Sequence, residues 1–272
     1  MKNSNNKDFK FAFGKLKIIS IVKLVLSFFI KLVKQITPLS YQYNLWALIR
    51  GRPRVGKVDF GSLRRLTPIS NTFGFDRGLP VDRYYIEKFV CANAKHIKGR
   101  VLEIGDATYT RKFGRSNVSQ SDVLHLEEGN PEATIVADLT KADHISSNTF
   151  DCIILTQTLQ FIFDVTSALS TIYRILKPGG VLLATLPGIS QIDKQWAESC
   201  YWAFTVQSAH RLFKNKFASS DLKIEAYGNV LSAISFLQGL AVEDLHIKDL
   251  DYNDSSYQLI IGIKAVKPYR KL

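Results

Sequence analysis

From residue 82 onwards, short apolar runs alternate with helical or polar stretches, and this alternation limits the possible folds more than any other feature. Asp164 and Thr205 are placed to cap helices that reach about Leu176 and Phe217, and Asp82 to cap one that reaches about Lys98. Strands that alternate with such crossovers predict an α/β fold whose mostly parallel sheet has helices on both faces. The apolar runs predict seven strands, at 100–104, 123–126, 134–137, 152–155, 181–186, 222–227 and 257–266.

Charge is distributed unevenly along the chain. The formal net charge is +12, yet residues 1–80 carry fifteen Lys and Arg against three acids, whereas residues 81–272 carry twenty-one of each sign. We therefore divide the chain into a basic N-terminal extension, residues 1–80, and a globular domain, residues 81–272. Any attraction to an anionic partner is expected to belong to the extension.

The extension contains an apolar stretch at about 16–36. Lys23 and Lys31 leave only seven uncharged residues between them, too few for a membrane span. On a helical wheel the Lys and Ser residues from Lys17 to Lys34 fall within an arc of about 120°. The stretch therefore predicts an amphipathic helix. Its apolar face suits an anionic membrane surface, and it equally suits packing on the domain or on a second subunit.

The cysteines and histidines predict no metal site. Cys91, Cys152 and Cys200 are an odd number and widely spaced, which favours a reducing, cytoplasmic location over a disulfide framework. No two of the five histidines have the spacing of metal ligands. A cytoplasmic protein, with membrane association as an open alternative, is the expectation.

Acidic residues follow three consecutive predicted strands. Glu103 ends the first strand, Glu127 the second and Asp138 the third. The carboxyl ends of parallel strands are where such sheets bind ligands, and carboxylates there can accept hydrogen bonds from ribose hydroxyls and an adenine amino group. Gly105 would let the backbone approach a ligand closely. The pattern G-x-G-x-x-G is absent, which disfavours a nicotinamide cofactor.

Four short motifs resemble the class I S-adenosylmethionine-dependent methyltransferases, in particular the type 11 branch. They are Gly99-Arg-Val-Leu-Glu-Ile-Gly105, Ala137-Asp138-Leu139, Phe150-Asp-Cys-Ile-Ile-Leu-Thr-Gln-Thr-Leu159 and, most specifically, Tyr173-Arg-Ile-Leu-Lys-Pro-Gly-Gly-Val-Leu-Leu183. The resemblance covers about 185 residues and implies a Rossmann-like sheet that ends in an antiparallel hairpin. It departs in the first motif, where the family usually has two or three glycines and this chain has one.

The resemblance implies a set of cofactor-binding residues for S-adenosyl-L-methionine. Glu103 and Gly105 would line the methionine end, Glu127 would hold the ribose, and Asp138 and Leu139 would meet the adenine. Thr156 and Gln157 would border the methyl-transfer site. Because the glycines are few, Asp106 or Tyr109 is expected to contribute polar contacts to the first turn.

The acceptor and the general base are less constrained. A hydroxyl acceptor benefits from a base, and the candidates are His125, His210, Asp193 and Tyr201. The aromatic residues of segment 196–205 could stack on a sugar or an aromatic substrate, or simply pack in the core.

The same resemblance suggests O-methylation of a small molecule or glycan. The segment after the fourth strand lacks the Asn/Asp-Pro-Pro-aromatic motif of nucleic-acid amino-methyltransferases, and the domain carries no net positive charge, so we do not expect a nucleic-acid partner. Two alternatives stay open: a degenerate methyltransferase fold that serves as a binding or scaffold protein in a biosynthetic complex, and a sugar-nucleotide enzyme on a related sheet.

Overall fold

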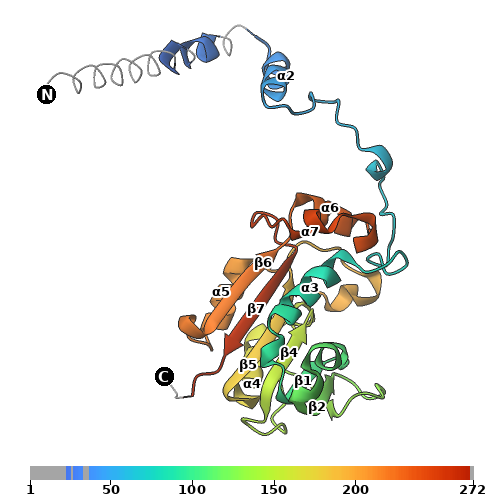
Figure 1. Ribbon diagram of the computed structural model, residues 1–272, viewed down its shortest axis with the longest axis vertical. Coiled ribbons are helices and arrows are strands. Elements are labelled where there is room, and N and C mark those ends of the chain that lie inside the picture. Colours follow the sequence, from blue (N-terminus) through green and yellow to red (C-terminus); the bar gives the residue numbers. More distant parts are fainter. Residues whose placement is uncertain (1–22, 26, 33–36, 270–272) are drawn as a thin grey trace, which may run out of the picture. The chain divides into compact units, whose positions relative to one another are not determined.

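The computed structural model describes residues 23–25, 27–32 and 37–269 (Figure 1). The chain divides into two compact units, residues 1–64 and residues 65–272. Each unit is considered by itself.

In the first unit, the described residues form short helices. Residues 23–25 and 27–32 are helical, α2 spans Leu39–Ile49, and a 3₁₀ turn spans Gly61–Leu63. The rest of the helix predicted at 16–36 lies outside the described residues. The sequence did not predict α2. Among the described residues, no helix combines the length and the apolar character needed to cross a membrane.

The second unit contains one seven-stranded sheet with the order β3-β2-β1-β4-β5-β7-β6. Neighbours among β1 to β5 pair in parallel, and β7 is antiparallel to both β5 and β6. This topology confirms the predicted mostly parallel sheet with a late antiparallel hairpin. The strands are β1 Gly99–Ile104, β2 Val118–His125, β3 Ile135–Val136, β4 Phe150–Thr156, β5 Leu176–Pro187, β6 Leu222–Tyr227 and β7 Ile260–Val266.

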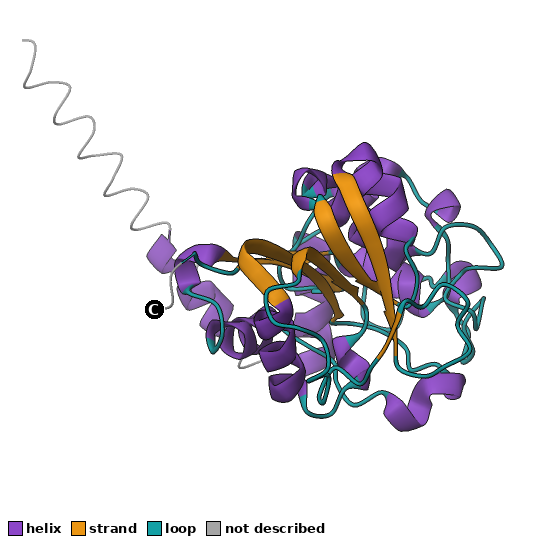
Figure 2. Ribbon diagram, turned by 90° about the horizontal axis from the view of Figure 1, so that it is seen from below, coloured by secondary structure: helices purple, strands orange, loops and turns teal. Residues whose placement is uncertain are grey.

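Helices cover both faces of the sheet (Figure 2). The longer ones are α3 Val81–Ala92, α4 Val165–Ile175, α5 Val206–Lys214, α6 Val230–Leu237 and α7 Ile247–Asp251. Short helical turns span Ala94–His96, Thr110–Gly114, Arg115–Asn117, Leu159–Phe161, Lys194–Ser199, Ser219–Asp221 and Val242–Asp244. Alternate strand residues point to opposite faces, so Leu102 packs in the core under α4 and α5, whereas Val101 packs in the core under α3 and α6.

Two of the three predicted helix caps are confirmed. The Asp164 carboxylate accepts a hydrogen bond from the Ser167 amide, and the Thr205 hydroxyl accepts one from the Ser208 amide. The prediction for Asp82 is wrong, because Pro80 occupies the N-cap of α3 and the helix ends at Ala92. Proline fixes φ near the helical value and needs no amide partner, so the helix can begin directly after it.

Residues 69–80, which we placed in the basic extension, belong to the second unit and pack against its segments near residue 240. The Ile69 amide donates to the Gln238 carbonyl at 2.8 Å, and the Val242 amide donates to the Leu79 carbonyl at 2.8 Å. Arg77 forms an ion pair with Asp244 at 2.6 Å. The boundary between the two units of the structure therefore lies at residues 64 and 65 rather than near residue 80.

Candidate cofactor and acceptor site

The turn after β1 is organised by a buried carboxylate. Glu103 is only 2% exposed, and its two carboxylate oxygens accept from the amides of Tyr109 at 3.0 Å and Thr110 at 2.7 Å. Burial raises the pKa of Glu103, and the hydrogen bonds to Thr110 and Tyr109 oppose that rise. The Glu103 side chain thus shapes the turn by holding the backbone that follows it.

Gly105 forms the bend of this turn and leaves open space beside it. Its φ is +91°, and a Cβ added there would meet no atom within 4 Å. The Gly105 amide donates to the Leu124 carbonyl at 3.0 Å, and its carbonyl accepts from Asn130 Nδ2 at 2.6 Å. A fixed peptide next to an open space can take a ligand that lies against the backbone. Sequence reasoning missed Asn130, although it follows Gly129 and precedes Pro131 in a turn-forming segment.

The side chain of Asp106 stabilises the turn after β1, which contains only one glycine, Gly105. Its carboxylate accepts from the Thr108 amide at 2.7 Å, and the chain then enters the short helical turn Thr110–Gly114. Asp106 is exposed. An aspartate that binds the amide two residues ahead closes the turn without further glycines, which explains how this chain departs from the glycine-rich pattern.

Glu127 is exposed after the end of β2, and its carboxylate accepts no hydrogen bond from the described residues. Its backbone is held by His125, whose Nδ1 lies 2.8 Å from the Glu127 carbonyl oxygen and 3.3 Å from the Glu127 amide nitrogen. The His125 ring therefore faces this turn, where it positions Glu127. The Glu127 carboxylate is available to a ligand on the same edge as Gly105, since β1 and β2 are parallel neighbours.

Asp138 and Leu139 follow β3 and differ in their surroundings. The exposed Asp138 carboxylate accepts from the amide and the hydroxyl of Thr140, both at 2.8 Å. Leu139 is 4% exposed, and its side chain packs in the core under α4. Only the backbone of Leu139 is left to face a ligand, whereas Asp138 keeps an exposed carboxylate oxygen.

At the end of β4, Gln157 has a φ of +47°, which is uncommon for a residue other than glycine. Its amide donates to the Thr185 carbonyl at 3.0 Å, and its Nε2 lies 3.3 Å from the Thr185 hydroxyl. Thr156 precedes it at the strand end. A conformation of this kind costs on the order of 1–3 kcal/mol and is retained where the surroundings hold it, commonly at binding sites.

Gln160 connects this strand end to the segment after β5, and sequence reasoning missed it. Gln160 is 5% exposed, and its Nε2 donates to the Gln157 carbonyl at 2.8 Å. The backbone carbonyl of Gln160 accepts from the Tyr201 amide at 2.8 Å. Its buried Oε1 accepts no hydrogen bond from the described residues. A buried acceptor without a partner is costly, so this atom is a further candidate for a polar ligand contact.

Aromatic side chains from the same two segments form an exposed cluster. Phe163 stacks on Trp202 with ring centres 5.8 Å apart and meets Tyr201 edge-on at 5.4 Å. Phe161 and Trp196 form a second pair at 6.0 Å. Phe163 is 69% exposed and Trp196 54% exposed. We call these five residues the aromatic cluster. Four of them are exposed and Phe161 is half-buried. In segment 196–205 only the Phe204 ring is buried, so core packing is excluded for Trp196, Tyr201 and Trp202.

The four candidate bases lie in different places. Asp193 caps the turn Lys194–Ser199 by accepting from the Gln195 amide at 2.7 Å, and Tyr201 belongs to the aromatic cluster. His210 is exposed on α5, and His125 holds the Glu127 turn. Only Asp193 and Tyr201 therefore lie in the segment that follows β5. Within the described ranges, no group of His, Cys, Asp and Glu has an arrangement that could hold a metal ion.

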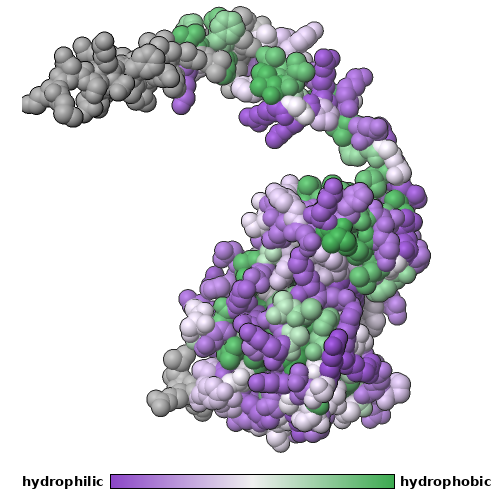
Figure 3. Space-filling model, viewed as in Figure 1, coloured by the Kyte–Doolittle hydropathy of each residue, from purple (hydrophilic) through white to green (hydrophobic). Residues whose placement is uncertain are grey.

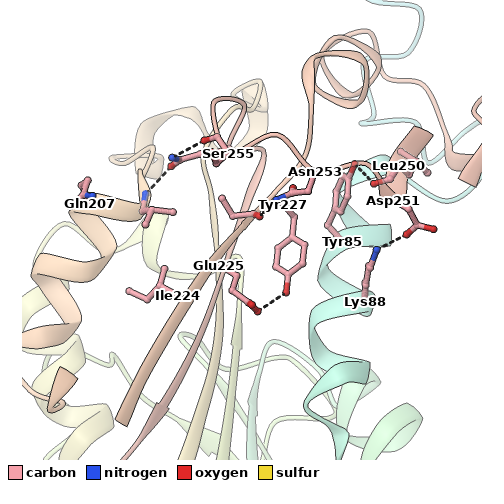
Figure 4. A pocket seen from close by; sticks show the side chains of 13 residues that line it. Tyr85, Lys88, Gln207, Ile224, Glu225, Tyr227, Leu250, Asp251, Asn253 and Ser255 are labelled. Atoms are coloured by element: carbon pink, nitrogen blue, oxygen red, sulfur yellow. Dashed lines mark hydrogen bonds and ion pairs between the residues drawn. The ribbon is translucent and has the colours of Figure 1, made fainter. Parts of the chain in front are cut away.

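A cavity of about 530 Å³ lies elsewhere, along the edge strand β6 between α3 and α5 (Figure 4). Several of its polar groups pair with one another or with the backbone: Tyr227 donates to Glu225 at 3.2 Å, and Tyr85 donates to the Leu250 carbonyl at 3.0 Å. The cavity is lined by none of the residues assigned to cofactor binding and none of the candidate bases. We assign the site to the carboxyl edge, where the parallel strands end, because that edge has the exposed carboxylates of Glu127 and Asp138 and the open space at Gly105.

The strand order with an antiparallel β7, together with the turn at Gly105 and the strand-end acids, defines a class I methyltransferase fold. Residues 88–184 match the family model described as a methyltransferase domain. The fold and this match agree on a methyltransferase domain of the class that uses S-adenosylmethionine.

Similar proteins include a ubiquinone/menaquinone biosynthesis C-methyltransferase, UbiE, from Klebsiella pneumoniae, which is 29% identical over 180 residues. The alignment covers 62% of each protein, so the chain spans less than two thirds of this relative's length.

Among solved structures, a SAM-dependent methyltransferase from Archaeoglobus fulgidus is 14% identical, covering 68% of this chain and 99% of that one, with a TM-score of 0.46. Phosphoethanolamine N-methyltransferase 2 from Haemonchus contortus is 18% identical, covering 73% and 60%, with a TM-score of 0.42.

Proposed function

We propose that this protein transfers a methyl group from S-adenosylmethionine to a hydroxyl group of a small molecule or glycan. The observation that carries the proposal is the open space and the exposed carboxylate at the carboxyl edge of the sheet. There, Gly105 leaves open space beside a fixed peptide, and the carboxylate of Glu127 has no protein partner among the described residues. The bound cofactor would supply a methyl group on a sulfonium, already activated for displacement.

The donor side of this site consists of the turns after β1, β2 and β3. The Gly105 turn, held by Glu103 and Asn130, offers backbone groups to the methionine part of the cofactor. Glu127 would accept from the ribose hydroxyls, since both of its oxygens are free. Asp138 would accept from the adenine amino group with the oxygen that Thr140 does not use. These residues bind and orient the donor, and orientation is what an in-line displacement mainly requires.

The acceptor side consists of the segments after β4 and β5. The Tyr201 amide donates to the Gln160 backbone carbonyl, and Gln160 Nε2 donates to the Gln157 carbonyl, so these contacts join the two segments next to the aromatic cluster. Exposed aromatic rings next to a buried, unpartnered amide oxygen suit an acceptor with a flat or sugar-like face and a polar group. Tyr201 and Asp193 are the polar side chains of this segment that could assist loss of the hydroxyl proton.

Calorimetry with S-adenosylmethionine and S-adenosylhomocysteine tests the donor side. We expect micromolar binding, on the order of −8 kcal/mol, that weakens at least about tenfold in Glu127→Ala and in Asp138→Ala, because charged hydrogen bonds are lost. Glu128→Ala is the matched control, since Glu128 is the exposed neighbour of Glu127. A folded protein that binds neither ligand would favour the scaffold alternative, and binding of a nicotinamide dinucleotide would favour a sugar-nucleotide enzyme.

Incubation with labelled S-adenosylmethionine tests the acceptor. Candidate lipid-linked glycans and small aromatic alcohols are offered in parallel with protein and RNA. Label in a glycan or alcohol, stable to mild acid and base as an ether is, is the expected result. Incorporation only into RNA or protein would contradict the proposed acceptor class without affecting the donor site.

A further inference from the structure

The helix α2 has apolar side chains exposed on more than one side. Leu45, Leu48 and Ile49 lie on one side at helical spacing, and all three are exposed, Leu48 by 64% and Ile49 by 66%. Leu39 and Tyr43 are exposed on another side. Figure 3 shows a hydrophobic patch at α2, beside strongly hydrophilic side chains. A helix that is apolar on several sides is stable only when something covers it.

The sequence around α2 carries charge of one sign. Between residues 9 and 58 there are ten Lys and Arg and no acid. Arg50, Arg52 and Arg54 follow α2 directly and are exposed. The surface that covers α2 must therefore tolerate or favour a dense positive charge, which points to an anionic partner.

Aromatic residues occur among the apolar side chains of α2, and one of them contacts an arginine. Tyr41, Tyr43 and Trp46 belong to α2, and the Arg50 guanidinium lies 5.4 Å from the centre of the Trp46 ring. Tyr and Trp concentrate where hydrocarbon meets lipid headgroups, and Arg there can reach the phosphates. The short helix of residues 27–32 repeats the pattern, with exposed Phe28 and Phe29 beside Lys31.

These three properties select one occupant. A nucleic acid would satisfy the arginines and leave the apolar sides of α2 in water. A second copy of the chain would bring another dense positive charge against the first and would be repelled. An anionic bilayer surface accepts both the apolar sides and the cations.

We propose that α2 and the basic segment 50–57 form a binding surface for membranes that contain anionic lipid. The helix lies in the plane of the headgroups with its leucines towards the acyl chains, and the arginines contact lipid phosphates. The surface is independent of methyl transfer, and it suits an acceptor that is itself anchored in a membrane.

Co-sedimentation of the full chain with vesicles tests this surface. Binding to phosphatidylcholine vesicles that contain phosphatidylglycerol is expected to exceed binding to phosphatidylcholine alone by at least about tenfold. Changing Arg50, Arg52 and Arg54 to Glu should remove that excess. Changing the exposed Lys95, Lys98 and Lys214 of the second unit to Glu is the matched control and should leave most of it. Leu48→Ser with Ile49→Ser should weaken binding to both kinds of vesicle.

Several outcomes would overturn the proposal. They are equal binding to the two kinds of vesicle, equal losses in the arginine and lysine variants, and association into a dimer that Leu48→Ser with Ile49→Ser disrupts. Tight binding to an RNA oligonucleotide without vesicle binding would assign the arginines to nucleic acid instead. S-adenosylmethionine affinity measured on the same variants should not change, so failure here and failure of the methyltransferase proposal are distinguishable.

Discussion

The proposed donor side and the proposed acceptor side of the carboxyl edge are built in opposite ways. On the donor side, the side chains of Glu103, Asp106 and Asn130 are occupied by backbone groups, so the shape of the site exists before a ligand arrives. On the acceptor side, Phe163 and Trp196 expose their rings, and the two segments meet through ring contacts and through hydrogen bonds to the backbone of Gln160 and Ile162. The contrast separates a preorganised half, suited to one common donor, from a half whose exposed rings decide the acceptor.

The largest effect is expected from Gly105→Ala. The new methyl group would fill the space beside the fixed peptide, and we expect S-adenosylmethionine affinity to fall about 10- to 100-fold. Calorimetry measures this directly. Gly56→Ala is the matched control, because Gly56 also has a positive φ and open space at its Cβ position but lies in the first unit. If both variants bind the donor equally, the space beside Gly105 is not a ligand site.

A smaller loss on the donor side is expected from Asn130→Asp. Aspartate keeps the acceptor for the Glu132 amide at 2.9 Å but cannot donate to the Gly105 carbonyl. We expect donor affinity to fall about tenfold, through loss of one buried hydrogen bond, with little change in the melting temperature. Unchanged affinity would mean that the Gly105 peptide holds its position without Asn130.

The contrast between the donor and acceptor sides predicts that Phe163→Ala affects the acceptor and leaves the donor unaffected. Removal of this ring should lower kcat/KM for the acceptor about three- to tenfold, the range for loss of an aromatic pair. Donor affinity should stay the same, since Phe163 lies outside the donor turns. Steady-state kinetics with each substrate varied in turn separates the two. A parallel loss of donor affinity would show that the two sides are coupled.

The smallest effect on the site is expected from Ser70→Ala. The Ser70 hydroxyl is buried, accepts from the amides of Thr72 and Gly74, and donates to Asp76. Its loss should lower the free energy of unfolding by about 1 kcal/mol and leave donor affinity unchanged. Denaturant unfolding at neutral pH, with calorimetry for the donor, measures both.

The same variant has a defined pH dependence. Hydrogen bonds from Ser70 and Thr72 hold the pKa of Asp76 below its ordinary value of 3.8. A lowered pKa stabilises the folded state above the unfolded value, and this stabilisation is lost as the pH falls through the folded value. The difference in the free energy of unfolding between wild type and Ser70→Ala should therefore be constant above about pH 5 and should become smaller below pH 3.8. A difference that widens in acid would contradict this assignment.

The sequence predicted the features that depend on neighbouring residues. All seven strands were located, and β6 was placed at its observed limits, because apolar patterning is a local property. The Asp164 and Thr205 caps followed from residues three positions apart. The predicted cap at Asp82 was wrong because Pro80, two residues earlier, is the N-cap of α3.

Contacts between distant residues were not predictable in this way. Asn130 reaches Gly105 across 25 positions, and the backbone of Gln160 meets that of Tyr201 across 41. Residues 69–80 contact segments near residue 240 through backbone hydrogen bonds, which leave no trace in hydropathy. Gly239 is the clearest case. Its φ of +67° and the Ser70 carbonyl 2.2 Å from a would-be Cβ require glycine, for a reason that only the fold reveals.

The position of β7 has a consequence for biosynthesis. This strand lies between β5 and β6, so the sheet has a gap until residues 260–266 have been made. The ribosome completes α2, the helix for which we propose membrane contact, some 200 residues earlier, which corresponds to about 10 to 40 s at ordinary elongation rates. A nascent chain could thus attach to a bilayer before its catalytic domain is able to fold, and translation would finish at the membrane surface.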